Sequence, residues 1–330
     1  MRSFARTMVR PALALAAACA LATAANAQEW KWNMPAPYAD GSFHTKNTKM
    51  FADDVRKYTN GRLDITVHPN GSLFKLPEIK RAVQTGQVPI AETNLPAYGN
   101  EYPFFEVDVI LFLAQGYDQV AKLWKVTRPY VEKRLNDQGI TILYTVPFPG
   151  MGMLSKVPIT KVADMKGMKQ RSWGPAASRF AELVGATPTV LQASELSQAF
   201  TVGIVDATLT SSTTGVATQA WDYAKYFVDL QATHSKDTII VNTKAFAALP
   251  KDVQDAVWRA AREAEKRGWD WSKREGEETK ARLAKEGMTI LTPDPAFQAE
   301  LRKVGATMVQ DWEKRAGAEG TAALKAFRSQ

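Results

Sequence analysis

Cysteine and histidine are scarce in this chain, which has one cysteine, Cys19, and three histidines among 330 residues. His44, His68 and His234 have neither the mutual spacing nor the cysteine partners that a metal site needs. The chain also lacks a G-x-S-x-G nucleophile elbow, a G-x-G-x-x-G loop and a Walker loop. These absences argue against a disulfide scaffold, a serine hydrolase and a nucleotide-dependent enzyme. We therefore expect no catalytic residues, no metal and no cofactor.

A long apolar run occurs only at the N-terminus. Three arginines within residues 2–10 precede an apolar run over residues 12–25, which ends in the small-x-small pattern Ala25-Asn26-Ala27. The run is shorter than the roughly 20 residues that span a bilayer. It predicts a secretory signal peptide over residues 1–27, cleaved after Ala27, and export to the periplasm. Lipid attachment at Cys19 is the alternative, but three alanines precede it instead of a lipobox headed by leucine.

The predicted mature chain has neither cysteine nor a strong charge. Its 39 basic and 34 acidic side chains leave a net charge of +5, without the basic blocks that would indicate a nucleic-acid partner. Roughly 300 residues are enough for two lobes of ordinary domain size. No later segment is long and apolar enough to cross a membrane.

Helix and strand patterns alternate along the early chain. Apolar residues share one helical face over residues 51–58, and apolar and polar residues alternate as in a strand over 63–67. A helix is predicted over 76–84 and the next strand over 88–92. This rhythm favours an α/β fold with a mostly parallel sheet.

One helix–glycine–strand pattern occurs twice. The residues of 78–88 that define it recur in 195–205 at a constant offset of 117 residues. Chance is the alternative, because such units are common, but the repeat favours two similar lobes. Thr93-Asn94 and Thr210-Ser211 would then end equivalent strands. Since ligands gather beyond the carboxyl ends of strands in open α/β sheets, we expect these ends to face one another across a cleft.

The final third of the chain is predominantly helical. From residue 252 to 286 it contains no proline and is dense in Ala, Glu, Lys and Arg. This predicts one long helix, or two joined near Gly268 or Gly276. Three tryptophans between residues 258 and 271 are expected to anchor this helix on the lobes.

Taken in order, several short motifs resemble the solute-binding proteins of TRAP transporters, the DctP-like periplasmic substrate-binding subunits. Each motif is weak alone, but together they cover essentially the whole predicted mature chain. The stretches that carry the resemblance are T-N-G-R at 59–62, P-N-G-S-L at 69–73, the E-to-A segment 78–91, D-M-K-G-M-K-Q-R at 164–171, L-V-G-A-T-P at 183–188 and G-I-V-D at 203–206.

The resemblance implies a two-lobed periplasmic binding protein fold, type II-like, with a long C-terminal helix packed across both lobes. On this basis we expect lobe I to comprise residues 28–148 and about 237–276. Lobe II would comprise about 149–236 and about 277–330. The resemblance also implies a small organic carboxylate as ligand and a TRAP membrane permease as partner. We expect a monomer that does not itself span the membrane.

Within this family the arginine of the K-x-R motif grips the ligand's carboxylate, and here that residue is Arg171. A guanidinium presents a planar fork of donors that matches both carboxylate oxygens. A structural salt bridge, or simple exposure to solvent, is the alternative role for Arg171.

Two departures from the family pattern bear on the ligand. Gly152 stands where many members carry a second arginine, and Thr210 replaces an asparagine. Losing one cation and one amide favours a monocarboxylate, because a second buried carboxylate would lack a partner. Dicarboxylate binding by the same fold remains the alternative. So does a receptor subunit that reports ligand occupancy to a signalling protein.

Further candidates surround these positions in the sequence. Trp173 should lie on the same side of its strand as Arg171. Met and Trp side chains near the cleft would suit an aromatic or branched acid, although each could equally belong to the core. The loop 37–44 is expected to contribute from the first lobe. The complete set of predicted ligand-binding residues is Arg171, Trp173, Thr210, Ser211, Asn94, Tyr98, Phe43, Met151 and Gly152.

Overall fold

A computed structural model describes residues 30–329 of the chain. The predicted signal peptide, its cleavage after Ala27 and Cys19 therefore lie outside the described residues. Within residues 30–329, every helix is too short or too polar to be a membrane span.

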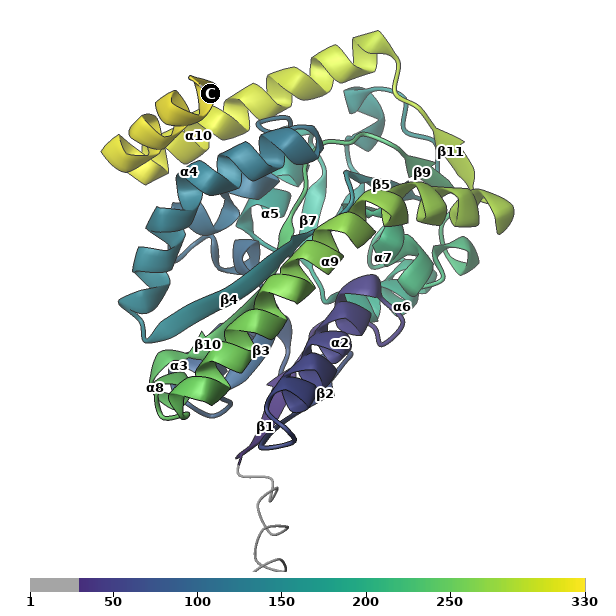
Figure 1. Ribbon diagram of the computed structural model, residues 1–330. Helices are drawn as coiled ribbons and strands as arrows, with labels where there is room; N and C mark the ends of the chain where they lie inside the picture. Colours follow the sequence, from purple (N-terminus) through teal and green to yellow (C-terminus); the bar gives the residue numbers. More distant parts are fainter. Residues whose placement is uncertain (1–29, 330) are drawn as a thin grey trace, which may run out of the picture.

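Two sheets build the first lobe of the molecule, in the lower half of Figure 1. One is a parallel pair, β1-β2, and the other has the order β3-β10-β4. The strands are β1 (Trp30–Pro35), β2 (Leu63–His68), β3 (Ile90–Asn94), β4 (Ile140–Pro147) and β10 (Lys236–Asn242).

One six-stranded sheet builds the second lobe, in the order β11-β9-β5-β8-β6-β7. Together the lobes form the two-lobed α/β fold that the sequence predicts. The strands are β5 (Met151–Ser155), β6 (Lys169–Ser172), β7 (Thr187–Val190), β8 (Ala207–Ser211), β9 (Tyr226–Val228) and β11 (Thr289–Leu291).

Helices cover the sheets and join the lobes (Figure 1). The short 3-10 segments are η1 (Leu95–Tyr98), η2 (Pro103–Val109), η3 (Val162–Met165), η4 (Ala193–Glu195) and η5 (Ala220–Asp222). The α-helices are α2 (Phe43–Tyr58), α3 (Leu76–Gln84), α4 (Gly116–Asn136), α5 (Pro175–Leu183), α6 (Leu196–Thr201), α7 (Ser212–Ala217), α8 (Thr243–Ala247), α9 (Lys251–Lys285) and α10 (Pro295–Arg328).

The expectation of a mostly parallel sheet needs correction. β10 runs antiparallel to both β3 and β4, and β5 runs antiparallel to both β8 and β9. β5 and β10 each follow a segment that crosses from one lobe to the other, without the crossover helix that makes neighbouring strands parallel. The six-stranded sheet is therefore mixed, and the β3-β10-β4 sheet has only antiparallel pairs.

The repeat predicted from the sequence is present in the structure. α3 and β3, moved by 117 residues, coincide with the combined η4–α6 segment, residues 193–201, and with β8. Gly86 and Gly203, which end the two helices, share a left-handed φ of 75°, a conformation that favours glycine. The strand predicted over 88–92 begins two residues later, at Ile90.

A single helix of 35 residues, α9, crosses the molecule diagonally from α8 to β11 (Figure 1). It packs on α2 and β4 of the first lobe and on α7 and β11 of the second. Gly268 lies inside it, where a β-carbon would overlap the side chain of Val146. Glycine thus permits a close approach here instead of ending the helix.

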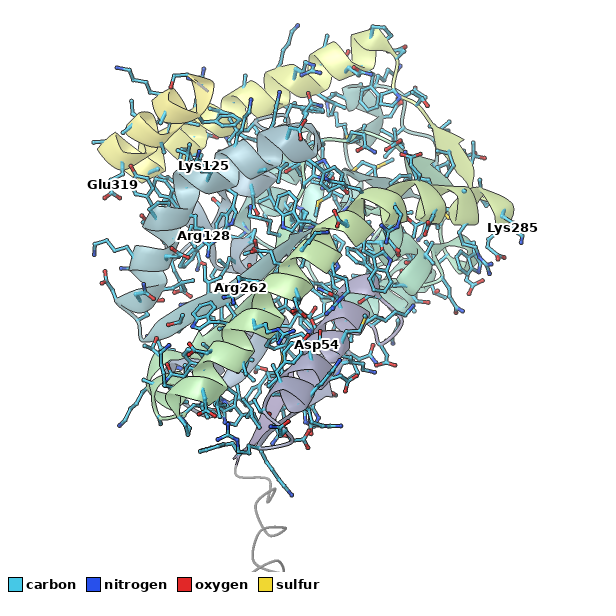
Figure 2. All side chains as sticks on the ribbon, in the orientation of Figure 1. Asp54, Lys125, Arg128, Arg262, Lys285 and Glu319 are labelled. Carbon is cyan, nitrogen blue, oxygen red and sulfur yellow. The ribbon has the colours of Figure 1, made fainter. Side chains whose placement is uncertain are left out.

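Tryptophans and charges hold α9 in place. Trp269 donates its Nε1–H to the carbonyl of Thr145 at 3.0 Å, as the anchoring prediction requires. On the opposite side, Arg267 pairs with Asp54 at 3.1 Å, and Figure 2 shows Asp54 on α2 at the boundary with α9. The last long helix, α10, lies beside α4 and also contacts α5, so it too touches both lobes.

The residue numbers at which one lobe gives way to the other stay a prediction.

Candidate functional site

A cavity lies where strand ends from the two lobes meet. It has about 480 Å³ of empty space, its opening included. Asn94 reaches it from the end of β3, Arg171 from β6 and Thr210 from β8. The two lobes thus place strand ends at one cavity, as the repeat predicts.

Five of the nine predicted ligand-binding residues line this cavity. They are Asn94, Met151, Arg171, Trp173 and Thr210. Trp173 follows β6 and donates its indole N–H to the carbonyl of Leu209 at 3.1 Å, which fixes the ring beside β8. The prediction that it lies on the same side as Arg171 agrees with this placement.

Three other predicted residues lie outside the cavity lining. Ser211 caps α7 by accepting the backbone N–H of Thr214. The Tyr98 hydroxyl is buried among the backbone of α3, where it accepts the N–H of Lys80 at 3.1 Å. Phe43 packs in the core beneath α9. These side chains support elements around the cavity without reaching it.

Gly152 also lies outside the lining. A β-carbon on Gly152 would overlap the carbonyl oxygen of Val228 and the ring of Phe227. An arginine does not fit there. Met151 is the residue of β5 that lines the cavity, although the register partner of Gly152 is Thr210, which lines it as well.

The site also contains residues that sequence reasoning did not single out. Leu76 begins α3, and Ala193, 117 residues later, begins the equivalent η4–α6 segment. Both residues line the cavity. The repeat could therefore have revealed this pair. Tyr38 belongs to the loop 37–44, which was predicted only as a whole. The remaining lining residues are Pro37, Gln192, Thr214 and Ser235, together with Phe148, whose closeness to Met151 in the sequence did suggest such a place.

Arg171 is a buried cation. Its side chain is 5% exposed, and its Nε donates to the carbonyl of Leu191 at 2.9 Å. No carboxylate among residues 30–329 forms an ion pair with it. Burial lowers the pKa of Arg171 to about 10, against the opposing influence of Tyr38, so the guanidinium stays charged at neutral pH. Of the described residues that line the cavity, it is the only charged one.

Two buried carboxyl groups lie behind the cavity wall. Asp237 of β10 is the register partner of Asn94, and Glu92 precedes Asn94 by two residues on β3. Burial raises the pKa of both, that of Glu92 to about 7. Within residues 30–329, no cluster of three or more His, Cys, Asp or Glu side chains is arranged to hold a metal ion.

The two histidines near the cavity, His44 and His234, both contact Phe148. Ser42 caps α2, so His44 does not cap that helix. The ring of His44 stacks on Phe148 with centroids 3.8 Å apart, and burial lowers its pKa to about 3, which keeps it neutral. The Nδ1 of His234 lies 3.0 Å from the carbonyl oxygen of Phe148. Both rings buttress the segment that leads into β5.

Comparison with known proteins gives strong matches. The family model described as "Bacterial extracellular solute-binding protein, family 7" (DctP) matches residues 36–315. A crystal structure of DctP7 from Bordetella pertussis, an extracytoplasmic solute receptor binding pyroglutamic acid, is 44% identical. It covers 90% of this chain and 99% of its own, with a TM-score of 0.88.

Two further relatives widen the comparison. A TRAP solute-binding protein from a marine metagenome microbe, in complex with co-purified pyroglutamate, is 38% identical; it covers 92% of this chain and 100% of its own, with a TM-score of 0.90. The C4-dicarboxylate-binding periplasmic protein DctP of Rhodobacter capsulatus is 28% identical over 85% of this chain and 86% of its own. The chain belongs to the DctP family of TRAP-transporter solute-binding proteins.

Proposed function

We propose that this protein is a periplasmic receptor that captures a small cyclic monocarboxylate of the pyroglutamate type and delivers it to a TRAP membrane permease. The observation that carries the proposal is the buried, unpaired guanidinium of Arg171 at the junction of the two lobes. A buried cation without a counterion is costly, and an anionic ligand offsets that cost.

The orientation of Arg171 suits a carboxylate. Because Nε is committed to the carbonyl of Leu191, the guanidinium is held in one plane. The two terminal nitrogens then form the fork that matches both oxygens of a carboxylate. A lysine at this position would keep the charge without this fixed geometry.

The rest of the cavity favours one carboxylate instead of two. Beyond Arg171 its described lining is neutral, and apolar surfaces come from Leu76, Phe148, Met151 and Trp173. A second carboxylate would be buried without a cation. Relatives that are 44% and 38% identical bind pyroglutamate, which has a single carboxylate on a small ring.

Capture would proceed by closure of the lobes. The carboxylate binds Arg171 on the second lobe, and Asn94 on the first lobe then contacts the same ligand. Such a ligand has more contacts in the closed state than in the open one, and this difference shifts the population toward closure. The mechanism needs no bond to be made or broken.

The test begins with the ligand that the protein retains during purification, identified by mass spectrometry after denaturation. The refolded, ligand-free protein is then titrated calorimetrically with L-pyroglutamate, acyclic monocarboxylates and C4-dicarboxylates. We expect L-pyroglutamate to bind most tightly and to raise the melting temperature. Tight binding of dicarboxylates alone, or of solutes without a carboxylate, would overturn the proposal.

A further inference from the structure

The side-chain amide of Asn94 has an unusual hydrogen-bond state. Its Nδ2 donates to the Oγ of Ser235 at 2.8 Å and to the carbonyl oxygen of Lys236 at 3.2 Å. Its Oδ1 has no partner among the described residues, although the side chain is 3% exposed. Buried polar atoms are nearly always paired, so this acceptor calls for an explanation.

The two donated bonds settle which way the amide points. A backbone carbonyl can only accept a hydrogen bond, so the atom that faces Lys236 must be the nitrogen. Both amide hydrogens are then used, and a rotation that exchanged nitrogen and oxygen would set two acceptors against each other. The oxygen is therefore a fixed acceptor without a hydrogen-bond partner, and the Tyr38 hydroxyl lies close to the same amide.

Asn94 lines the same cavity as Arg171, and Tyr38 lies close to both. Burial is the largest cause of the raised pKa of Tyr38. Arg171 and Asn94 lower this pKa, because both lie close to the Tyr38 hydroxyl. The cavity thus presents a fork of cationic donors and, on the facing lobe, one unpaired acceptor. A ligand that satisfies both has a carboxylate and an N–H donor.

We infer that Asn94 is the specificity-determining residue of this site, and that its Oδ1 accepts the ring N–H of a lactam carboxylic acid whose carboxylate is held by Arg171. This inference rests on the proposed function and adds the group that selects among cyclic acids. In a five-membered lactam acid the N–H is attached to the carbon that carries the carboxylate, so one small ring can present both groups. Replacing the ring N–H by an ether-type oxygen sets a lone pair against Oδ1.

The test compares two ligands of nearly equal shape, L-pyroglutamate and the lactone 5-oxotetrahydrofuran-2-carboxylate. Their dissociation constants are measured by calorimetry for the wild type, Asn94→Ala and Asn100→Ala. Asn100 is an exposed residue with no role in the cavity. We expect the wild type and Asn100→Ala to prefer the lactam by about 10- to 100-fold or more, and Asn94→Ala to bind the two acids about equally.

A second variant, Ser235→Ala, distinguishes a specific loss of the preference for the lactam from a general loss of folding. Ser235→Ala removes one of the two anchors of the amide while Lys236 keeps the other, so the preference for the lactam should fall only in part. Equal binding of both acids by the wild type would overturn the role of Asn94, as would a preference that persists in Asn94→Ala. Either result leaves the proposed function intact. If neither acid binds the wild type, both the proposed function and this inference fail.

Discussion

The carbonyl oxygen of Val228 occupies the space that a β-carbon on Gly152 would need. β9 therefore passes β5 too closely for any side chain at position 152. Position 152 is where many members of the family carry a second arginine, and this contact leaves no space for one here. Gly152 is required by the packing of two strands, and the residue of β5 that adjusts the cavity is Met151.

The first prediction concerns this close approach. Gly152→Ala should destabilise the protein by about 1–3 kcal/mol or more, because β9 must move to admit the methyl group. The matched control is Gly41→Ala, where a β-carbon would meet nothing within 4 Å. Denaturant unfolding of the two variants measures the difference. Equal stability would show that β9 yields without cost.

The second prediction places a cation at position 151, whose side chain lines the cavity. Met151→Arg should raise the affinity for C4-dicarboxylates relative to pyroglutamate, by at least about tenfold, because a second carboxylate then gains a partner. Met151→Leu keeps a similar apolar side chain and should leave the relative affinities unchanged. A folded Met151→Arg protein with an unaltered ratio would contradict the placement of residue 151.

The third prediction addresses Arg171. Arg171→Ala should weaken ligand binding by about 2–5 kcal/mol, and Arg171→Lys should also weaken it, because the charge remains while the bond to Leu191 and the planar fork are lost. Calorimetric titration with pyroglutamate measures both. Arg128→Lys is the control, because Arg128 lies on α4 (Figure 2) and outside the cavity lining. Full affinity in Arg171→Lys would mean that charge alone suffices.

The fourth prediction concerns pH. The pKa of Glu92 is raised by burial from 4.5 to about 7, so the folded protein keeps its proton after the unfolded chain has released it. The contribution of Glu92 to stability is therefore fully present below pH 4.5 and is lost as the pH rises through about 7. Glu92→Gln should remove the part of this loss that Glu92 contributes, at most about 3 kcal/mol, while the raised pKa of the neighbouring Asp237 leaves a further loss as the pH rises.

Melting temperatures across pH 4–8 test this expectation. The gain from Glu92→Gln over the wild type should grow between pH 4.5 and 7 and then level off. Glu278→Gln alters an exposed residue of α9 and should follow the wild type. A gain that is constant with pH would indicate that Glu92 titrates alike in both states.

Much of the fold follows from local sequence signals. The bounds of α3 and the helical character of residues 252–285 follow from apolar periodicity and the absence of proline, which act over a few residues, whereas the sequence leaves open whether α9 is one helix or two. The direction of β5 and β10 was not predictable in this way. It depends on where the chain crosses between lobes, which no local pattern records.

The residues of the site divide in the same way, into those that local motifs predict and those that depend on contacts between distant parts of the chain. Arg171 could be predicted because a motif marks it, and Asn94 and Thr210 because the repeat marks the strand ends. That position 152 has no room for a side chain depends on β9 lying beside β5, and this contact is made with residues more than 70 positions away. Tyr98 and Phe43 are close in sequence to residues that line the cavity. Their rings nevertheless pack in the core, beneath α3 and α9 respectively.

The order of the strands has a mechanical consequence. Within the described residues, the chain passes from one sheet to the other after β4, returns after β9, and passes over again through α9 after β10. Two bodies joined by three covalent struts at separate points cannot twist freely about one another. Three connections therefore restrict how far the two lobes can twist or shift relative to one another.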